Sequence, residues 1–205
     1  MSAVLASDFA LAQFSFLQRL LLVHGRQSQR RNADLVCYAF YKNIVYVMAN
    51  FYYACYSAFS AQAFYPAALI STYNMLWTSL PTIAVAIFDK DVSDEAVLAA
   101  PSLYRGVRET AKRGLYMRTF ATWLLDAFWH SLVVYYVPFA VYAGVVASDN
   151  GTQAGGVTLL GVVTYTICIT VVNVRIGMIV CQWSWPQHVT IYLISVVLWF
   201  PFLYG

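Results

Sequence analysis

The sequence predicts an all-α membrane protein with five transmembrane helices. Of its 205 residues, 61% are hydrophobic and only 10% are charged, whereas soluble domains carry about 25% charged residues. No polar stretch is long enough to bury a core of its own, but several apolar runs approach the roughly 20 residues that a helix needs to cross a bilayer. These runs cover residues 35–60, 65–88, 119–143, 157–174 and 188–204.

The first run, 35–60, contains a single charge, Lys42. A lysine in hydrocarbon costs about 2.5–3.5 kcal/mol on insertion scales. Two explanations are open. The side chain could extend back to the cytosolic interface from about 12 Å inside the membrane. Alternatively, the ammonium faces the bundle and binds an anionic or zwitterionic group, or serves as a charge coupled to transport; the adjacent Asn43 is a candidate for the same site.

The second run, 65–88, carries Asn74 in its middle and Pro81 shortly after it. A proline in a transmembrane helix frees a backbone carbonyl for a neighbour or a ligand. Asn74 either makes an interhelical hydrogen bond, worth about 0.6–2 kcal/mol in membranes, or lines a polar path together with Lys42. If the two side chains face each other across the hairpin, they form a polar site within the bilayer.

Two further groups of ionisable residues have a structural and a functional explanation. Asp126 and His130 are spaced i, i+4 and share one helix face. They are either a pair whose polar groups are satisfied inside the bundle or a proton relay. Asp89, Asp91, Asp94 and Glu95 form an acidic cluster, either a helix cap where the chain leaves the membrane or a divalent cation site. Aromatic residues make up 17% of the chain, and those near the ends of the runs are typical of membrane–water interfaces.

The basic residues predict the orientation of the chain. Of the twelve Lys and Arg residues, the eleven other than Lys42 precede the first run, lie between the second and third, or end the fourth. By the positive-inside rule the N-terminus is then cytosolic and the C-terminus lies outside. Asn150-Gly151-Thr152 is an N-glycosylation sequon in the predicted outer loop. Residues 1–33 form a basic cytosolic stalk, and 34–205 form the membrane domain.

Several classes of function are excluded or weakened. The chain contains no phosphate-binding GxxxxGK[ST] loop, no HExxH, no GxSxG and no Asp-Lys-Thr-Gly, so these residues have no visible means of hydrolysing a nucleotide and no catalytic or metal-binding residue is assigned. The four cysteines are scattered without a CxxC pair. A net charge of +3 does not argue for nucleic acid.

Several ordered motifs follow one another along the first half of the chain: Phe40-Tyr41-Lys42-Asn43, Phe59-Ser60-Ala61-Gln62, Tyr73-Asn74, Thr78-Ser79-Leu80-Pro81 and Phe88-Asp89-Lys90-Asp91-Val92-Ser93-Asp94-Glu95. These motifs resemble the fifth and sixth helices, and the loops after them, of the type IV P-type ATPases, the phospholipid flippases. The segment 6–26 is similar to the exit from the family's phosphorylation domain. Similarity runs over essentially the whole chain and is densest in its first half.

The resemblance implies that the five runs are helices five to nine of a ten-helix domain, without the last helix. It implies that a full-length protein uses ATP and Mg²⁺ to move a phospholipid from the outer to the cytosolic leaflet, and that Lys42 and Asn74 contribute to headgroup passage. It also implies a eukaryotic plasma, Golgi or endosomal membrane, and an accessory β-subunit as a possible partner.

One alternative remains open. The chain could be a non-catalytic membrane scaffold, a remnant of a truncated or fused flippase-like protein, and by itself it is expected to be inactive as a pump. An ion channel is disfavoured because the sequence has no filter-like repeat and no acidic ring. The first two runs hold no carboxylate between Asp34 and Asp89, which suits an anionic or zwitterionic headgroup better than a bare cation.

Overall fold

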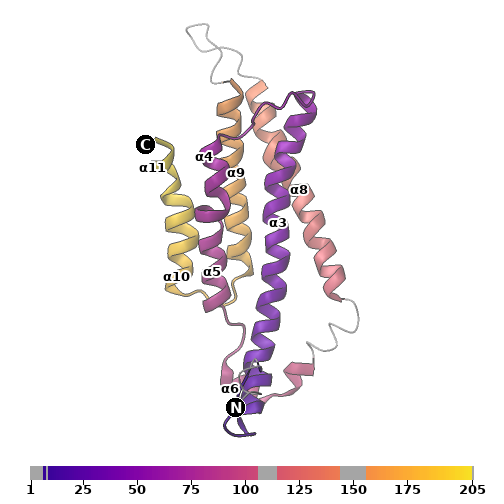
Figure 1. Cartoon of the computed structure of the whole chain (residues 1–205), viewed down its shortest axis with the longest axis vertical. Coiled ribbons are helices and arrows are strands. Elements are labelled where there is room, and N and C mark those ends of the chain that lie inside the picture. Colours follow the sequence, from indigo (N-terminus) through magenta and orange to yellow (C-terminus); the bar gives the residue numbers. More distant parts are fainter. Residues whose placement is uncertain (1–6, 8, 106–114, 144–155, 205) are drawn as a thin grey trace.

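The computed structural model describes residues 7, 9–105, 115–143 and 156–204 of the chain. This part is helical and contains no strand, so the all-α prediction is confirmed. Long helical segments lie side by side in one elongated bundle (Figure 1). The end of the bundle with α6, Asp94–Ala99, is called the lower end, and the opposite end the upper end (Figure 1).

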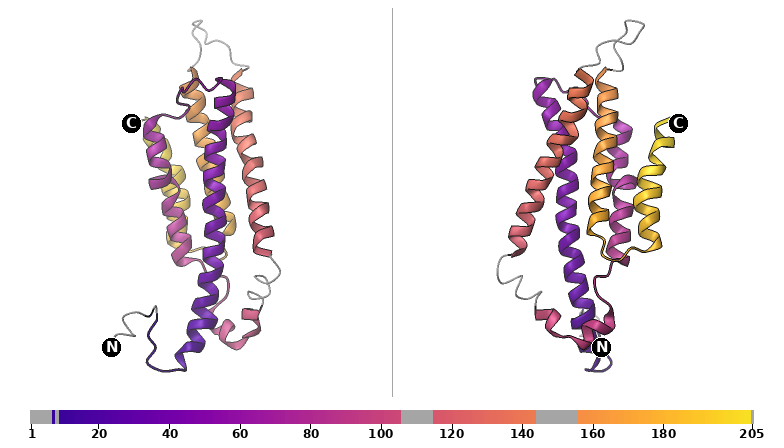
Figure 2. Two further views of the ribbon diagram at one scale, coloured as in Figure 1. Left: turned by 45° about the vertical axis from the view of Figure 1, so that its right-hand side comes forward. Right: turned by 180° about the vertical axis from the view of Figure 1, so that it is seen from behind.

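The helix α3, Arg26–Tyr56, is the longest element and packs against both α8 and α9. It contains neither glycine nor proline, so nothing interrupts its backbone hydrogen bonds. Two short elements, α2, Phe16–Arg19, and η1, Leu20–Gly25, lead into it. The helix starts before the apolar run 35–60 and crosses the predicted boundary at residue 33, so its lower part extends beyond the other long helices (Figure 2).

The turn that follows α3 has an unusual backbone. Ala58, Phe59 and Ala61 have positive φ angles of 50°, 56° and 60°, a conformation that costs an L-residue roughly 1–2 kcal/mol. All three side chains are exposed, so no buried side chain requires this conformation. The turn therefore stores strain at the upper end of the molecule.

We expect Ala58→Gly and Ala61→Gly each to stabilise the protein by about 0.5–1 kcal/mol, because glycine adopts positive φ freely and loses only part of that gain to chain entropy. The measurement is the temperature at which detergent-solubilised full-length protein loses monodispersity. Ala63→Gly is the control, since residue 63 has no positive φ. If all three variants lost monodispersity at the same temperature, the inference that Ala58 and Ala61 are strained would be wrong.

The segment 67–88 is a helix with a widened middle. It consists of α4, Ala67–Thr72, the π-helical η2, Tyr73–Trp77, and α5, Ser79–Phe88. We call it the broken helix. Pro81 is the third residue of α5, where a missing backbone N–H costs little. The irregular turns therefore lie N-terminal to the proline, around Asn74.

Three elements complete the bundle. α8, Leu115–Ala143, carries Pro138 within it, and α9 spans Gly156–Ile179. The last column comprises α10, Trp185–His188, η3, Val189–Val197, and α11, Trp199–Tyr204; Ser184 and Gln187 form a capping box at its start. In the described residues two helical stretches are long and apolar enough to cross a membrane, Tyr116–Tyr142 and Gly156–Ile179.

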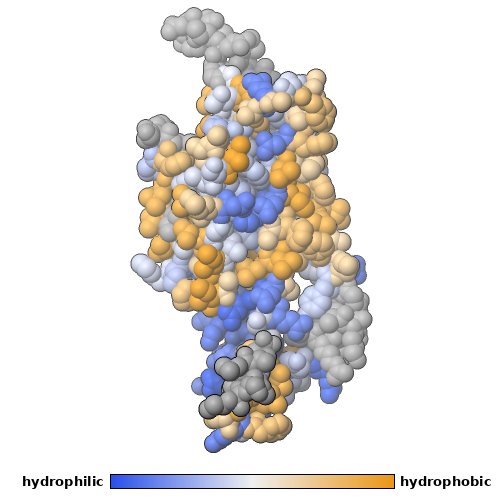
Figure 3. Space-filling view, viewed as in Figure 1, coloured by the Kyte–Doolittle hydropathy of each residue, from blue (hydrophilic) through white to orange (hydrophobic). Residues whose placement is uncertain are grey.

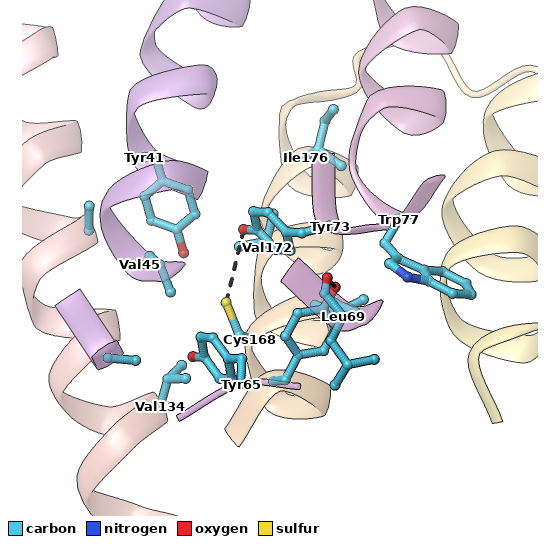
Figure 4. Close-up of a cluster of buried hydrophobic side chains, with 14 of the residues drawn as sticks. Tyr41, Val45, Tyr65, Leu69, Tyr73, Trp77, Val134, Cys168, Val172 and Ile176 are labelled. Atoms are coloured by element: carbon cyan, nitrogen blue, oxygen red, sulfur yellow. Dashed lines mark hydrogen bonds between the residues drawn. The ribbon is translucent and has the colours of Figure 1, made fainter. Parts of the chain in front are cut away.

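Tyrosines fill the core between α3, the broken helix and α9. The Tyr46 ring stacks on Tyr73 at 4.3 Å and on Tyr65 at 5.0 Å between ring centroids, and Tyr165 packs edge-on against this group. Figure 4 shows Tyr65 and Tyr73 on either side of Cys168. Many aromatic residues thus pack in the interior, besides those at the helix ends that the sequence suggested.

Charged contacts join the elements at the lower end, where hydrophilic residues gather beneath the apolar bundle (Figure 3). The Arg26 guanidinium donates two hydrogen bonds to the Asp91 carboxylate, at 3.0 and 2.5 Å, and Arg30 lies 3.3 Å from the same carboxylate. Burial alone would raise the pKa of Asp91, but the Arg26 hydrogen bonds and the two guanidinium charges outweigh it and lower the pKa below its ordinary value.

Two more polar contacts fix the lower end of the broken helix. The Arg31 guanidinium donates to the carbonyls of Ala86 and Ile87, at 2.8 and 3.0 Å, and so caps the last turn of α5. The buried Asp89 carboxylate accepts the backbone N–H groups of Cys181 and Gln182, at 2.8 and 3.1 Å. The lower end of α5 is therefore held by α3 on one side and by the α9–α10 turn on the other.

Candidate functional site

Lys42 lies inside the bundle. Its side chain is buried, with 8% of the residue exposed, and its ammonium donates a hydrogen bond to the Thr78 hydroxyl at 2.9 Å. Thr78, fully buried, follows η2 directly. The side chain therefore faces the bundle, where it contacts the broken helix.

The backbone of Lys42 is bound to the same part of the broken helix. The Tyr73 hydroxyl donates to the Lys42 carbonyl at 2.8 Å, and the Thr78 hydroxyl donates to the Tyr73 carbonyl at 2.9 Å. Tyr73 is completely buried. Three hydrogen bonds thus form a closed ring through Lys42, Thr78 and Tyr73.

Side chains satisfy the carbonyl groups around the widened turn. The Ser79 hydroxyl donates to the Asn74 carbonyl, and Asn173 of α9 donates to the Trp77 carbonyl at 3.3 Å. The Tyr165 hydroxyl, also from α9, reaches the Leu69 carbonyl at 2.7 Å. Because buried carbonyls need partners, this set of donors shows that the π-helical turn is an integral part of the fold. π-Helical turns are frequent at functional sites.

Asn43 and Asn74, the asparagines predicted to share a site with Lys42, lie on the outer face of these two helices. Asn43 and Asn74 are both exposed in the described structure, and Asn50 is half-buried. The described contacts join Lys42 to Thr78 and do not join it to Asn74. Figure 3 shows hydrophilic residues interrupting the apolar surface of the bundle over η2 and α3. Asn150 lies outside the described residues.

An open hollow of about 270 Å³ lies at the upper end of α3. Its lining includes Asn50, Ser57, Gln62, Tyr65 and Ile70. Asn43 and Asn50 are seven residues apart, or about two helical turns, and so share one face of α3, and Ser57 directly follows the helix. We call these three separate polar positions the polar stripe; it runs from the hollow to the level of Lys42, with Val47 and Ala54 on the turns between.

Asp126 and His130 do not bond to each other. Asp126 pairs with Arg175 of α9 at 2.7 Å, whereas the His130 ring nitrogen Nδ1 hydrogen-bonds the Tyr41 hydroxyl at 2.7 Å. The Arg175 guanidinium also lies over the Trp123 ring, 4.5 Å from its centroid. These contacts tie α8 to α9 and to α3, which corresponds to the interpretation of the two residues as satisfied groups.

The acidic cluster has partners of its own. Asp91 and Asp89 are engaged as described above, Asp94 contacts Arg19, Gln27 and Lys90, and Ser93 caps α6. Within the described residues, no group of three or more His, Cys, Asp or Glu side chains is placed to hold a metal ion. The contacts fit the helix-cap interpretation of this loop.

Sequence reasoning missed Thr78 and Tyr73 as partners of Lys42. Threonine and tyrosine are common in apolar helices, and no local pattern distinguishes a hydroxyl that faces a neighbouring helix. Pro81 was the available signal, because it marks a disturbed helix. Arg175 was expected at the end of the fourth run and lies within α9, which continues to Ile179; its pairing with Asp126 was missed because the two residues come from different helices.

The fold and the buried lysine together define an all-helical bundle with a polar site between two of its helices. The family model for the phospholipid-translocating P-type ATPase C-terminal region matches residues 4–204. The human phospholipid-transporting ATPase ID is 36% identical over 205 residues, covering 99% of this chain and 16% of the relative. The Arabidopsis thaliana protein named "Probable phospholipid-transporting ATPase 4" is 37% identical over 209 residues, covering 100% of this chain and 17% of the relative.

The chain therefore belongs to the type IV P-type ATPases and corresponds to their C-terminal region. Its relatives are phospholipid-transporting membrane proteins, and the chain spans about a sixth of their length.

Proposed function

We propose that this chain is the membrane part of an ATP-driven phospholipid translocase and that Lys42 contacts the lipid headgroup. The observation that carries the proposal is the buried ammonium of Lys42, which has a neutral hydroxyl as its hydrogen-bond acceptor. An ammonium has three donors and a full charge. A buried cation is costly unless it is paired, so the protein gains from an additional negatively charged or carbonyl acceptor at this place.

The surroundings of Lys42 favour the binding of an anionic part of a headgroup over the binding of a metal cation. Residues 35–88 contain no carboxylate, and among the described residues Lys42 has no ion-pair partner. The acceptor we propose is the phosphate or carboxylate of a phospholipid headgroup. Phosphate accepts short, charge-assisted hydrogen bonds that are about twice as strong as neutral ones.

The route that we propose for the headgroup follows the polar stripe on α3. The headgroup would occupy the hollow at the upper end, pass Asn50 and Asn43, and reach the level of Lys42 and Asn74. All these side chains except Lys42 are exposed or half-exposed on the described bundle. Acyl chains could remain in lipid while the headgroup contacts amide groups.

The remaining features of the proposal concern the whole protein. Five helical columns span the membrane, with the stalk 1–33 and the lower end cytosolic, and lipid moves from the outer to the cytosolic leaflet. ATP and Mg²⁺ act in domains outside these 205 residues. The five columns correspond to helices five to nine of the family. A eukaryotic plasma, Golgi or endosomal membrane is the proposed location, and a β-subunit is a proposed partner.

The test is Lys42→Met in the full-length parent protein. Methionine keeps the length of the side chain but removes the charge, so we expect lipid-stimulated ATP hydrolysis to need about tenfold more lipid for half-saturation, or to be lost. The ATPase rate is measured against phospholipid concentration in detergent micelles.

Lys90→Met is the matched control. Lys90 is half-exposed at the lower end and pairs with Asp94 at 3.4 Å, an interaction of the exposed kind that contributes about 0–1 kcal/mol. It should leave the lipid dependence unchanged. Wild-type lipid dependence of Lys42→Met would refute the headgroup contact, whereas a wild-type parent without lipid-stimulated ATP hydrolysis would favour the alternative, a non-catalytic membrane scaffold.

A further inference from the structure

The ring of hydrogen bonds around Lys42 has a defined direction. A threonine hydroxyl has one proton to donate and two lone pairs to accept with. Thr78 donates its proton to the Tyr73 carbonyl, and its oxygen is therefore left to accept from the Lys42 ammonium. The carbonyl thus orients the hydroxyl, and the hydroxyl orients the ammonium.

The π-helical turn makes this arrangement possible. Thr78 reaches back five residues to the Tyr73 carbonyl, and the adjacent Ser79 reaches back five residues to the Asn74 carbonyl. Backbone bonds span four residues in a regular α-helix and five in a π-helical turn. The two side-chain bonds follow the five-residue spacing of the widened turn, and the Thr78 oxygen lies within hydrogen-bonding distance of Lys42.

The third bond closes the ring from the other helix. The Tyr73 hydroxyl donates to the Lys42 carbonyl at 2.8 Å, so the residue that receives the Thr78 proton also fixes the backbone of α3. The α3 helix and the widened turn are therefore held in register at the height of the ammonium. Lys42, Thr78 and Tyr73 are all buried, so water does not compete strongly for these bonds.

We propose that Thr78 is a positioning residue that holds the Lys42 ammonium in the orientation in which it meets the lipid headgroup. This inference rests on the function proposed above. Thr78 does not itself contact the lipid in this mechanism. Without its hydroxyl the ammonium loses an acceptor, and the long side chain is free to adopt other rotamers.

The experiment compares Thr78→Val and Thr78→Ser in the full-length protein. Valine has nearly the shape of threonine but no hydroxyl, and we expect it to raise the half-saturating lipid concentration about tenfold. Serine retains the hydroxyl and should restore a value close to that of the wild type. If the Thr78→Val protein does not accumulate in cells, Thr78→Ala removes the same hydroxyl without adding a methyl group.

Thr170→Val is the matched control. The Thr170 side chain is exposed on α9, and its hydroxyl donates to the Thr166 carbonyl of its own helix at 2.9 Å. Removing this hydroxyl should not change the lipid dependence. An equal effect of Thr170→Val and Thr78→Val would show a general loss of helix stability and would overturn the positioning role.

A double variant separates positioning from a merely structural effect. If Thr78 acts through Lys42, adding Thr78→Val to Lys42→Met should change the lipid dependence no further, because coupled residues are not additive. Fully additive effects would overturn the inference. Wild-type lipid dependence of Thr78→Val, alongside an impaired Lys42→Met, would refute the positioning role alone, whereas wild-type behaviour of Lys42→Met would refute the proposed function itself.

Discussion

Replacing Gly161 with alanine should destabilise the protein by about 1–3 kcal/mol, the usual cost of overpacking. Gly161 is a buried residue of α9 that lies against the backbone of Phe64, just before the broken helix. A Cβ atom at this position would overlap the Phe64 carbonyl oxygen and would lie 3.2 Å from the carbonyl carbon. A backbone group cannot rotate away as a side chain can, so α9 and the 57–66 connection would have to separate.

The same helix provides the control. A Cβ atom at Gly177 would meet the Trp183 ring at 3.4 Å and 3.6 Å, which is an ordinary contact, and alanine improves helix propensity by up to about 1 kcal/mol. Gly177→Ala should therefore be neutral or slightly stabilising. The measurement is the monodisperse fraction of full-length protein that survives heating in detergent. If Gly161→Ala were as stable as Gly177→Ala, the close approach of Gly161 to the Phe64 backbone would be contradicted.

Replacing Asp89 with alanine should destabilise the lower end by about 2–3 kcal/mol. The Asp89 residue is 4% exposed, and one oxygen accepts two backbone N–H groups of the α9–α10 turn. Leaving buried donors without an acceptor costs about 1–3 kcal/mol. The turn should then loosen, and Cys181, the exposed cysteine within it, should react faster with a maleimide. Mass spectrometry identifies the modified residue.

Asp89→Asn tests whether the hydrogen bonds or the charge matter. An asparagine carbonyl oxygen can still accept both N–H groups, so this variant should keep most of the stability and the slow labelling of Cys181. The labelling rate of Cys55, which is at the other end of α3, serves as an internal reference. Fast Cys181 labelling in the asparagine variant would mean that the charge, and not the acceptor, holds the turn.

The sequence was sufficient to predict an all-helical protein and to select Lys42. A single charge in an apolar run is visible without a structure, because hydrophobicity and charge are local properties. The widened turn was only partly predictable. Pro81 indicated a disturbed helix, but the π-helical residues lie N-terminal to it, around Asn74, where side-chain hydroxyls and α9 satisfy the carbonyls.

Contacts between distant helices could not be predicted from spacing. Asp126 and His130 share a helix face as expected, yet their partners, Arg175 and Tyr41, come from two other helices. Likewise, nothing local marks Thr78 as the acceptor for Lys42. The positive φ angles at Ala58 and Ala61 were equally invisible, since alanine does not favour that conformation.

The uninterrupted course of α3 has a mechanical consequence. With 31 residues, the helix is a rod of about 46 Å. It contains no glycine or proline, the residues at which helices usually kink. A rotation applied to its arginine-rich lower part would therefore be passed along the helix to Lys42. Tyr73 and Thr78 bond to Lys42 at that height, so these hydrogen bonds would be the first contacts with the broken helix to feel the rotation.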